Sequence, residues 1–234
     1  STLWLHGTYT LGSRITLPAG QSITYNGTWS TTTGFQVNGG SLNLGGTWRA
    51  TNTSIDVTAG SLSFTSNGAT LDGVTLNANL SLGDQWVNVV NGLTLNGTLS
   101  FNGGSRVYFG GGSQTLAGTG TVLFNNSNHQ GLIAATDGMT LTIGSGITVR
   151  GGNSSVGNAS SGSVIGYSDW AGGGNNISIV NQGTILANAA GRGIFIYARG
   201  SGTFTNAGST RVENGGSLYV IGASGDMATI AISG

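Results

Sequence analysis

Carboxyl groups have the widest catalytic repertoire of any side chain, and this chain holds few of them. It contains six Asp and one Glu, and no two of these acids are adjacent. Hydrolysis of a glycosidic bond needs two carboxyl groups about 5 to 10 Å apart. No spacing between successive acids matches the repeat of 19 to 25 residues described below, so no such pair is expected on one surface. The sequence therefore predicts no catalytic residue and no enzyme activity.

Metal ligands and clustered charges are equally scarce. Cys is absent, and His6 and His129 lie far apart in the chain, so we expect no metal site and no cofactor. Seven Arg balance the seven acids and Lys is missing, which leaves no basic cluster for nucleic acid or for an anionic membrane surface. No run of 18 apolar residues occurs. Nucleic acid and membrane insertion are therefore not expected.

Aromatic side chains are the better candidates for ligand binding. Trp29 and Trp48 are separated by one repeat and should lie one above the other, with Tyr25 beside them. If these rings face outward they form a platform for sugar rings, and if they face inward they form a column in the core. We favour the core for the two Trp side chains. Tyr25, Trp29 and Trp48 nevertheless remain candidate glycan contacts, together with Trp170 in a Gly-rich segment.

The composition and the hydrophobic pattern together predict a protein built from short strands. Gly, Thr, Ser and Asn supply more than half of the 234 residues, and both Gly and β-branched Thr disfavour helices. Runs of alternating apolar and polar residues, bounded by Gly and Asn, are typical of strands joined by tight turns. Such runs occupy 13–17, 21–25, 41–44, 54–57, 61–64, 73–76, 92–95, 98–101, 105–109, 121–124, 140–143, 146–149 and 217–220.

These runs recur along the chain with a period. Three pairs of segments match at shifts of 20, 19 and 25 residues: 37–44 with 57–64, 26–29 with 45–48, and 181–185 with 206–210. Self-similarity at this period is typical of a solenoid. The sequence therefore predicts an all-β fold, a single right-handed parallel β-helix over residues 1–234. About 10 to 12 turns, each rising about 4.8 Å, would make a rod about 50 to 55 Å long.

Stacked turns should place equivalent side chains in columns along the rod. The apolar positions expected to face inward are Ile15, Leu17, Leu42, Leu44, Leu62, Phe64, Leu93, Leu95, Leu141 and Ile143. Asn residues at the turns can stack their amides in the same way. The Gly/Ser/Asn-rich segment 151–176 interrupts the rhythm and is expected to be a loop insertion, with 164–167 as its only strand-like run. An antiparallel sandwich or barrel is the alternative fold, disfavoured because successive repeats match directly.

Several segments resemble a repeat found in very large bacterial extracellular proteins. The segments that carry this resemblance are 70–77, 90–99, 112–122, 141–151 and 180–185, the last containing Asn-Gln-Gly-Thr-Ile. The proteins concerned are autotransporter passengers and filamentous-haemagglutinin-like adhesins, and the resemblance covers roughly residues 34 to 222. It implies a secreted or surface-displayed right-handed β-helix and carries over no catalytic residue.

The expected function is a structural segment of a secreted or cell-surface bacterial protein, such as an adhesin stalk or passenger rod. The alternatives are a subunit that stacks end to end on copies of itself to form an extracellular filament, and a β-helix that binds surface glycans. Ice binding is disfavoured, because only two pairs of Thr-x-Thr motifs, 31–33 with 51–53 and 119–121 with 140–142, have the spacing of a turn, which makes no continuous array. No signal peptide is evident, so we interpret the chain as a mature protein or a fragment of a longer one.

Overall fold

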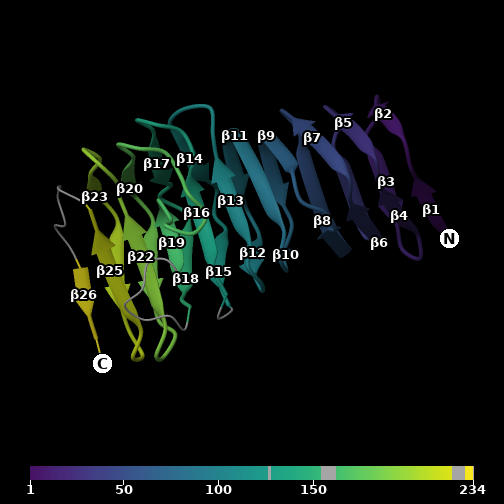
Figure 1. Ribbon diagram of the computed structural model, residues 1–234. Coiled ribbons are helices and arrows are strands. Elements are labelled where there is room, and N and C mark those ends of the chain that lie inside the picture. Colours follow the sequence, from purple (N-terminus) through teal and green to yellow (C-terminus); the bar gives the residue numbers. More distant parts are fainter. Residues whose placement is uncertain (126–127, 154–161, 223–229, 234) are drawn as a thin grey trace.

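The fold is a stack of parallel strands. The structure is a computed structural model that describes residues 1–125, 128–153, 162–222 and 230–233. Within those ranges every pairing between strands is parallel and no helix occurs, so none is available to span a membrane. The chain forms a β-solenoid of about ten turns that progresses from the N-terminus at one end to the C-terminus at the other (Figure 1). The predicted parallel β-helix is confirmed.

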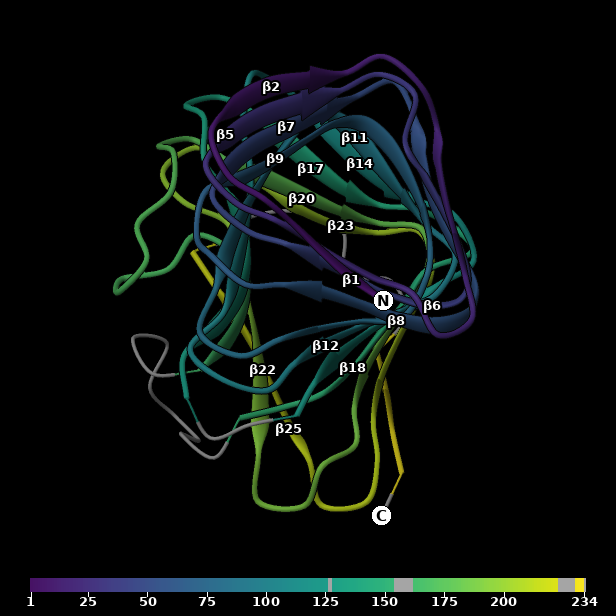
Figure 2. The same ribbon diagram turned by 90° about the vertical axis from the view of Figure 1, so that its right-hand side faces the viewer.

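The strands of successive turns stack into three columns, here called the first, second and third faces. Together the three faces surround a single core (Figure 2). The first face consists of β2 (Thr8–Leu11), β5 (Thr28–Thr31), β7 (Thr47–Thr51), the first halves of β9 (Ala69–Asn77) and β11 (Trp86–Leu95), β13 (Arg106–Phe109), β16 (Gln130–Ala134), β19 (Ser163–Gly166), β22 (Gly193–Tyr197) and β25 (Ser217–Ile221).

The other two faces are built in the same way. The second face consists of β3 (Ile15–Pro18), the first halves of β6 (Phe35–Leu44) and β8 (Ser54–Phe64), the second halves of β9 and β11, β14 (Gln114–Ala117), β17 (Thr140–Ile143), β20 (Ser178–Asn181) and β23 (Phe204–Asn206). The third face consists of β1 (Thr2–Leu5), β4 (Ser22–Tyr25), the second halves of β6 and β8, β10 (Leu80–Leu82), β12 (Thr98–Phe101), β15 (Thr121–Phe124), β18 (Thr148–Gly151), β21 (Thr184–Ala187), β24 (Ser209–Val212) and β26 (Ile230–Ile232).

The register of the stack follows the sequence repeats. Ser41–Leu44 of β6 pairs residue for residue with Ser61–Phe64 of β8, and Trp29 pairs with Trp48. Asn181 likewise pairs with Asn206, at the predicted shift of 25. The matched segments lie one above the other because a parallel in-register stack brings equivalent residues of successive turns together. All three sequence matches are therefore structural neighbours.

The core is a set of apolar columns, as predicted. Nine of the ten positions expected to face inward are buried, and Ile15, in the first complete turn, is partly buried against the same core. Between the first and second faces the chain turns at Asn52, Gly73 and Asn91, which all have positive φ values, of 47°, 60° and 57°. Gly and Asn tolerate this conformation better than other residues, which explains their places at the turns.

The predicted insertion at 151–176 is interrupted by a strand of the stack. β19 lies within it, pairs with β16 and β22, and is buried along its whole length. The strand-like run expected at 164–167 is thus confirmed, to within one residue. The segment is therefore not one continuous loop: an excursion follows β19, and residues 154–161, before β19, lie outside the described residues.

Candidate functional site

Three of the four predicted glycan contacts belong to the core. Tyr25, Trp29 and Trp48 are 1%, 3% and 2% exposed. The rings of Trp29 and Trp48 lie parallel within 6°, with their centroids 4.8 Å apart. Burial, together with the neighbouring Tyr9, raises the pKa of Tyr25 to about 12. These side chains occupy the inward positions of their strands, so their faces cannot serve as a sugar platform, and this alternative for them is wrong.

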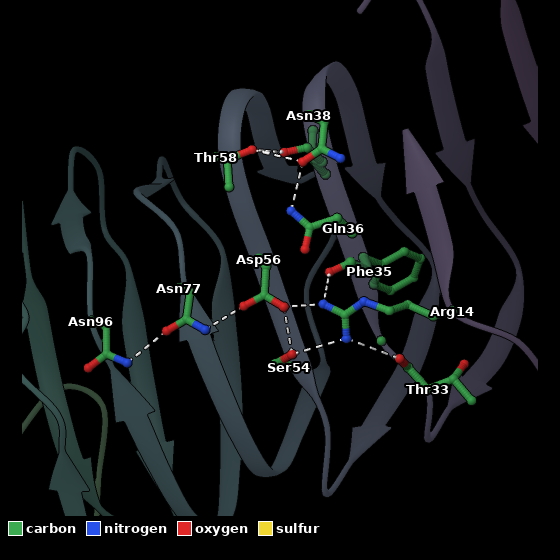
Figure 3. A network of polar contacts seen from close by, with 12 residues as sticks. Arg14, Thr33, Phe35, Gln36, Asn38, Ser54, Asp56, Thr58, Asn77 and Asn96 are labelled. Carbon is green, nitrogen blue, oxygen red and sulfur yellow. Dashed lines mark hydrogen bonds and ion pairs between the residues drawn. The ribbon is translucent and has the colours of Figure 1, made fainter. Parts of the chain in front are cut away.

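Two of the acids are held in ion pairs that join different turns of the stack. Arg14, before β3, contacts the Asp56 carboxylate of β8, two turns away, and donates hydrogen bonds to the Ser54 hydroxyl and the Phe35 carbonyl (Figure 3). Burial alone would raise the pKa of Asp56, but hydrogen bonds from Asn77, Ser54 and Arg14, with the Arg14 charge, outweigh it and hold that pKa below its usual value. Asp56 is therefore a stably ionised partner for Arg14.

The second ion pair is built in the same way. Arg49 of β7 lies 2.7 Å from the carboxylate of Asp72, which is buried, and Asn91 donates a hydrogen bond to the other carboxylate oxygen at 2.6 Å. Burial again opposes ionisation, and hydrogen bonds from Arg49, Asn91 and Thr51, with the Arg49 charge, again lower the pKa of the carboxyl. Both carboxylates thus act as structural anions.

Side-chain amides extend the first of these pairs along the rod. Asn77 donates a hydrogen bond to Asp56, and Asn96 donates one to Asn77 at 2.7 Å, so a polar ladder crosses four turns from Arg14 to Asn96 (Figure 3). Such stacking of Asn was expected; the Arg14 contact was not, because it skips a turn. Among the described residues, no three His, Asp or Glu side chains gather closely enough to hold a metal ion.

The fourth predicted contact, Trp170, lies on the surface. It belongs to the excursion between β19 and β20, and its side chain is 42% exposed. The Arg106 guanidinium carbon lies 4.0 Å from the centroid of the Trp170 ring, and the His129 ring lies 4.5 Å from it. The excursion therefore brings Trp170 over the outer surface of the first face, beside β13.

Trp170 forms one wall of an open cleft of about 510 Å³, here called the aromatic cleft. Its lining residues share the outer surface of β11 and β13 or lie in the segments above it: Trp86, Asn88, Arg106, Tyr108, Ala135, Trp170 and Ala171. Trp86 pairs with Arg106 and Asn88 with Tyr108 in the register of neighbouring turns. The Trp86 and Tyr108 rings meet edge to face, with centroids 6.4 Å apart. Three aromatic side chains thus converge at one place.

Hydrogen bonds hold the segment that carries Trp170. Ser168 and Gly172 exchange backbone hydrogen bonds at 3.0 and 2.7 Å, and the Ser168 hydroxyl accepts bonds from the N–H groups of Trp170 and Ala171. The Tyr108 hydroxyl donates to the Ala171 carbonyl at 3.3 Å, which ties this segment to β13. These hydrogen bonds therefore hold the backbone that carries Trp170 in place at the cleft.

The aromatic cleft carries a single charge among its lining residues, the Arg106 guanidinium. The Nε atom of Arg106 is buried and has no hydrogen-bond partner, and neither does Nδ1 of His129. A larger groove of about 570 Å³ on the second face is lined by residues such as Gly92, Thr115 and Thr142, and includes no aromatic or charged side chain. Of these two hollows, the aromatic cleft is thus the one whose side chains can recognise a ligand by stacking and by charge.

Sequence reasoning placed Trp170 among the aromatic candidates but missed Arg106 and Tyr108. Alternation along β13 predicts that the Arg106 side chain points outward, and the register of β13 with β11 could then have placed it beside Trp86. Nothing in the repeat could have placed Trp170 there, because it lies in an excursion that the repeat does not describe.

Comparison of the chain with family models, with curated proteins and with solved structures finds no match. The β-solenoid is shown by the structure, while the extracellular family indicated by the sequence motifs stays a prediction.

Proposed function

We propose that this chain is a structural rod of a secreted or surface-displayed bacterial protein, such as an adhesin stalk or passenger segment. The observation that carries the proposal is the regular stack: about ten turns add strands to the same three faces around one core. A solenoid grows in length without growing in width, because each turn contacts only its neighbours. At about 4.8 Å per turn, ten turns span about 50 Å.

Side-chain contacts between turns support a structural role. The ladder from Arg14 through Asp56 and Asn77 to Asn96 links turns by polar contacts in addition to the strand pairing. The location outside the cell rests on the resemblance of segments such as 90–99 and 180–185 to extracellular repeats. An enzymatic role is not proposed, since Asp56 and Asp72 are committed to ion pairs with Arg14 and Arg49.

A filament subunit is the second candidate, and the exposed apolar side chains at the two ends of the stack favour it. Leu3 and Trp4 of β1 are exposed at one end, and Ile232 of β26 is exposed at the other. Edge strands at both ends offer backbone groups for further pairing. A second copy stacked end to end would cover both features.

Electron microscopy of the purified chain separates the two candidates. The rod proposal predicts separate particles about 50 Å long at every protein concentration. Antibodies raised against the chain should also label intact, unpermeabilised cells that produce it. Filaments that lengthen with concentration and disappear on Trp4→Asp would establish the subunit instead, and labelling only after permeabilisation would overturn the surface location.

A further inference from the structure

We propose that the aromatic cleft binds an acidic polysaccharide, through a uronic acid residue seated against Trp170 and Arg106. This binding site goes beyond the structural role, which needs no ligand. The volume of about 510 Å³ lies within the range of ligand sites in proteins, about 300 to 1,000 Å³. Because the cleft is open to solvent along the rod surface, it accepts the side of a long chain.

Aromatic rings supply the surface for the sugar. Trp86 and Tyr108 come from neighbouring turns, and Trp170 faces the same cleft from the excursion after β19. Trp and Tyr present large apolar faces together with a polar group, so they pack against the C–H faces of a pyranose while hydroxyl groups remain solvated. Asn88, between them, offers an amide that can donate and accept hydrogen bonds to those hydroxyls.

Arg106 gives the cleft its preference for an acid. A guanidinium presents paired N–H donors that match the two oxygens of a carboxylate, and charge-assisted bonds of this kind are about twice as strong as neutral ones. Arg106 is the one charged residue among the described residues that line the cleft. No lining residue is acidic; Asp169 adjoins Trp170 in the chain but does not line the cleft.

The geometry is set before any ligand arrives. The Trp170 ring packs against the Arg106 guanidinium, whose central carbon lies 4.0 Å from the ring centroid, and the Ser168 turn and the Tyr108 hydroxyl hold the segment that carries Trp170. A site formed in advance loses little conformational entropy on binding. This favours measurable affinity even for a cleft that covers only one side of its ligand.

Isothermal titration calorimetry with two oligosaccharides of equal length tests the proposal. Hexagalacturonate carries a carboxylate on every sugar, and galactohexaose is its neutral counterpart. We expect the wild-type chain to bind hexagalacturonate at least tenfold more tightly than galactohexaose, with an affinity that falls as salt rises. Trp170→Ala should weaken hexagalacturonate binding at least tenfold, and Arg106→Gln should abolish the preference for the acid.

Trp4→Ala is the matched control, since Trp4 is also an exposed indole but lies in β1, outside the cleft. It should leave binding unchanged. Circular dichroism and thermal melts verify that each variant is folded, and Arg106→Met, which also removes the charge, replaces Arg106→Gln if the latter is not. Absence of binding to hexagalacturonate, equal affinity for the neutral oligosaccharide, or equal losses in Trp4→Ala and Trp170→Ala would overturn the proposal. None of these outcomes bears on the length or the assembly of the particles that electron microscopy would measure.

Discussion

Trp29 and Trp48 occupy equivalent inward positions in neighbouring turns, yet their indole N–H groups differ. The N–H of Trp29 donates to the Gly45 carbonyl at 2.9 Å, whereas the buried N–H of Trp48 has no acceptor. A buried donor without a partner costs about 1 to 3 kcal/mol of stability. The stacked pair thus contains one satisfied and one unsatisfied polar group within the same apolar column.

This difference predicts unequal effects of the same substitution. Trp29→Phe removes a made hydrogen bond and leaves the Gly45 carbonyl without its donor, whereas Trp48→Phe removes an unpaired donor. Both create a small cavity, so Trp29→Phe should lower the free energy of unfolding by about 1 to 2 kcal/mol more than Trp48→Phe. Urea unfolding of the two variants measures this difference. Equal losses, or a larger loss in Trp48→Phe, would contradict it.

At the scale of the element, the turns between the third and first faces depend on close backbone approach. Gly27 and Gly46 precede β5 and β7 in successive turns, with φ values of 90° and 77°. A Cβ on Gly46 would lie 2.0 Å from the Gly27 carbonyl oxygen. Glycine is required there both by conformation and by the spacing of the stack.

Gly46→Ala is therefore expected to destabilise the rod through two separate effects. The left-handed conformation costs about 1 to 2 kcal/mol with a Cβ present, and the clash adds about 1 to 3 kcal/mol. Gly138→Ala is the control, because Gly138 has a similar φ of 72° and no atom near its Cβ position. Thermal melts should show a clearly larger drop in Tm for Gly46→Ala. Equal drops would mean that conformation alone, and not the stacking, requires the glycine.

At the scale of the whole molecule, the two ion pairs that bridge turns among the described residues lie in the N-terminal half. Arg14 and Asp56 connect the first and third turns, and Arg49 and Asp72 connect the third and fourth. The third pair, Arg211 with Glu213, joins residues of one local segment at 3.2 Å. Acid should therefore weaken the N-terminal half of the rod more than the C-terminal half.

The direction of this pH dependence follows from the lowered pKa values. Asp56 and Asp72 titrate in the folded chain below about 3.9, the usual value for Asp in an unfolded chain. The contribution of the two ionised carboxylates to the free energy of unfolding is complete above that pH. It is lost as the pH falls through the lowered pKa values. The urea concentration at the midpoint of unfolding should thus decrease as the pH is lowered from 5 to 2.

Substitution of the two carboxyls provides the check on this assignment. The double variant that combines Asp56→Asn with Asp72→Asn should have a lower urea midpoint at pH 7. That midpoint should also change less than the wild-type midpoint when the pH is lowered. Glu213→Gln, the control, should leave the shape of the curve unchanged. A double variant that retains the full acid dependence would show that other groups cause it.

Much of the architecture was predictable because a parallel stack converts sequence similarity into contact. Residues that match at the repeat period, such as Trp29 with Trp48 and Ser41 with Ser61, are partners in the register. Alternation within each run set which side chains enter the core, so Leu42 and Leu44 could be assigned inward from the sequence. These features are local or periodic, and periodicity is visible in one sequence.

The aromatic cleft and the ion pairs were decided only by the tertiary structure. Arg14 meets Asp56 across 42 residues and two turns, and Tyr108 meets Ala171 across 63 residues. The turns differ in length, and the excursion after β19 follows no repeat, so the number of residues between two positions does not determine their distance. Whether Trp170 lies beside Arg106 or in open solvent depends on how that excursion folds back over the first face. Its placement comes from hydrogen bonds within the segment and from its contact with Tyr108, and the repeat specifies neither.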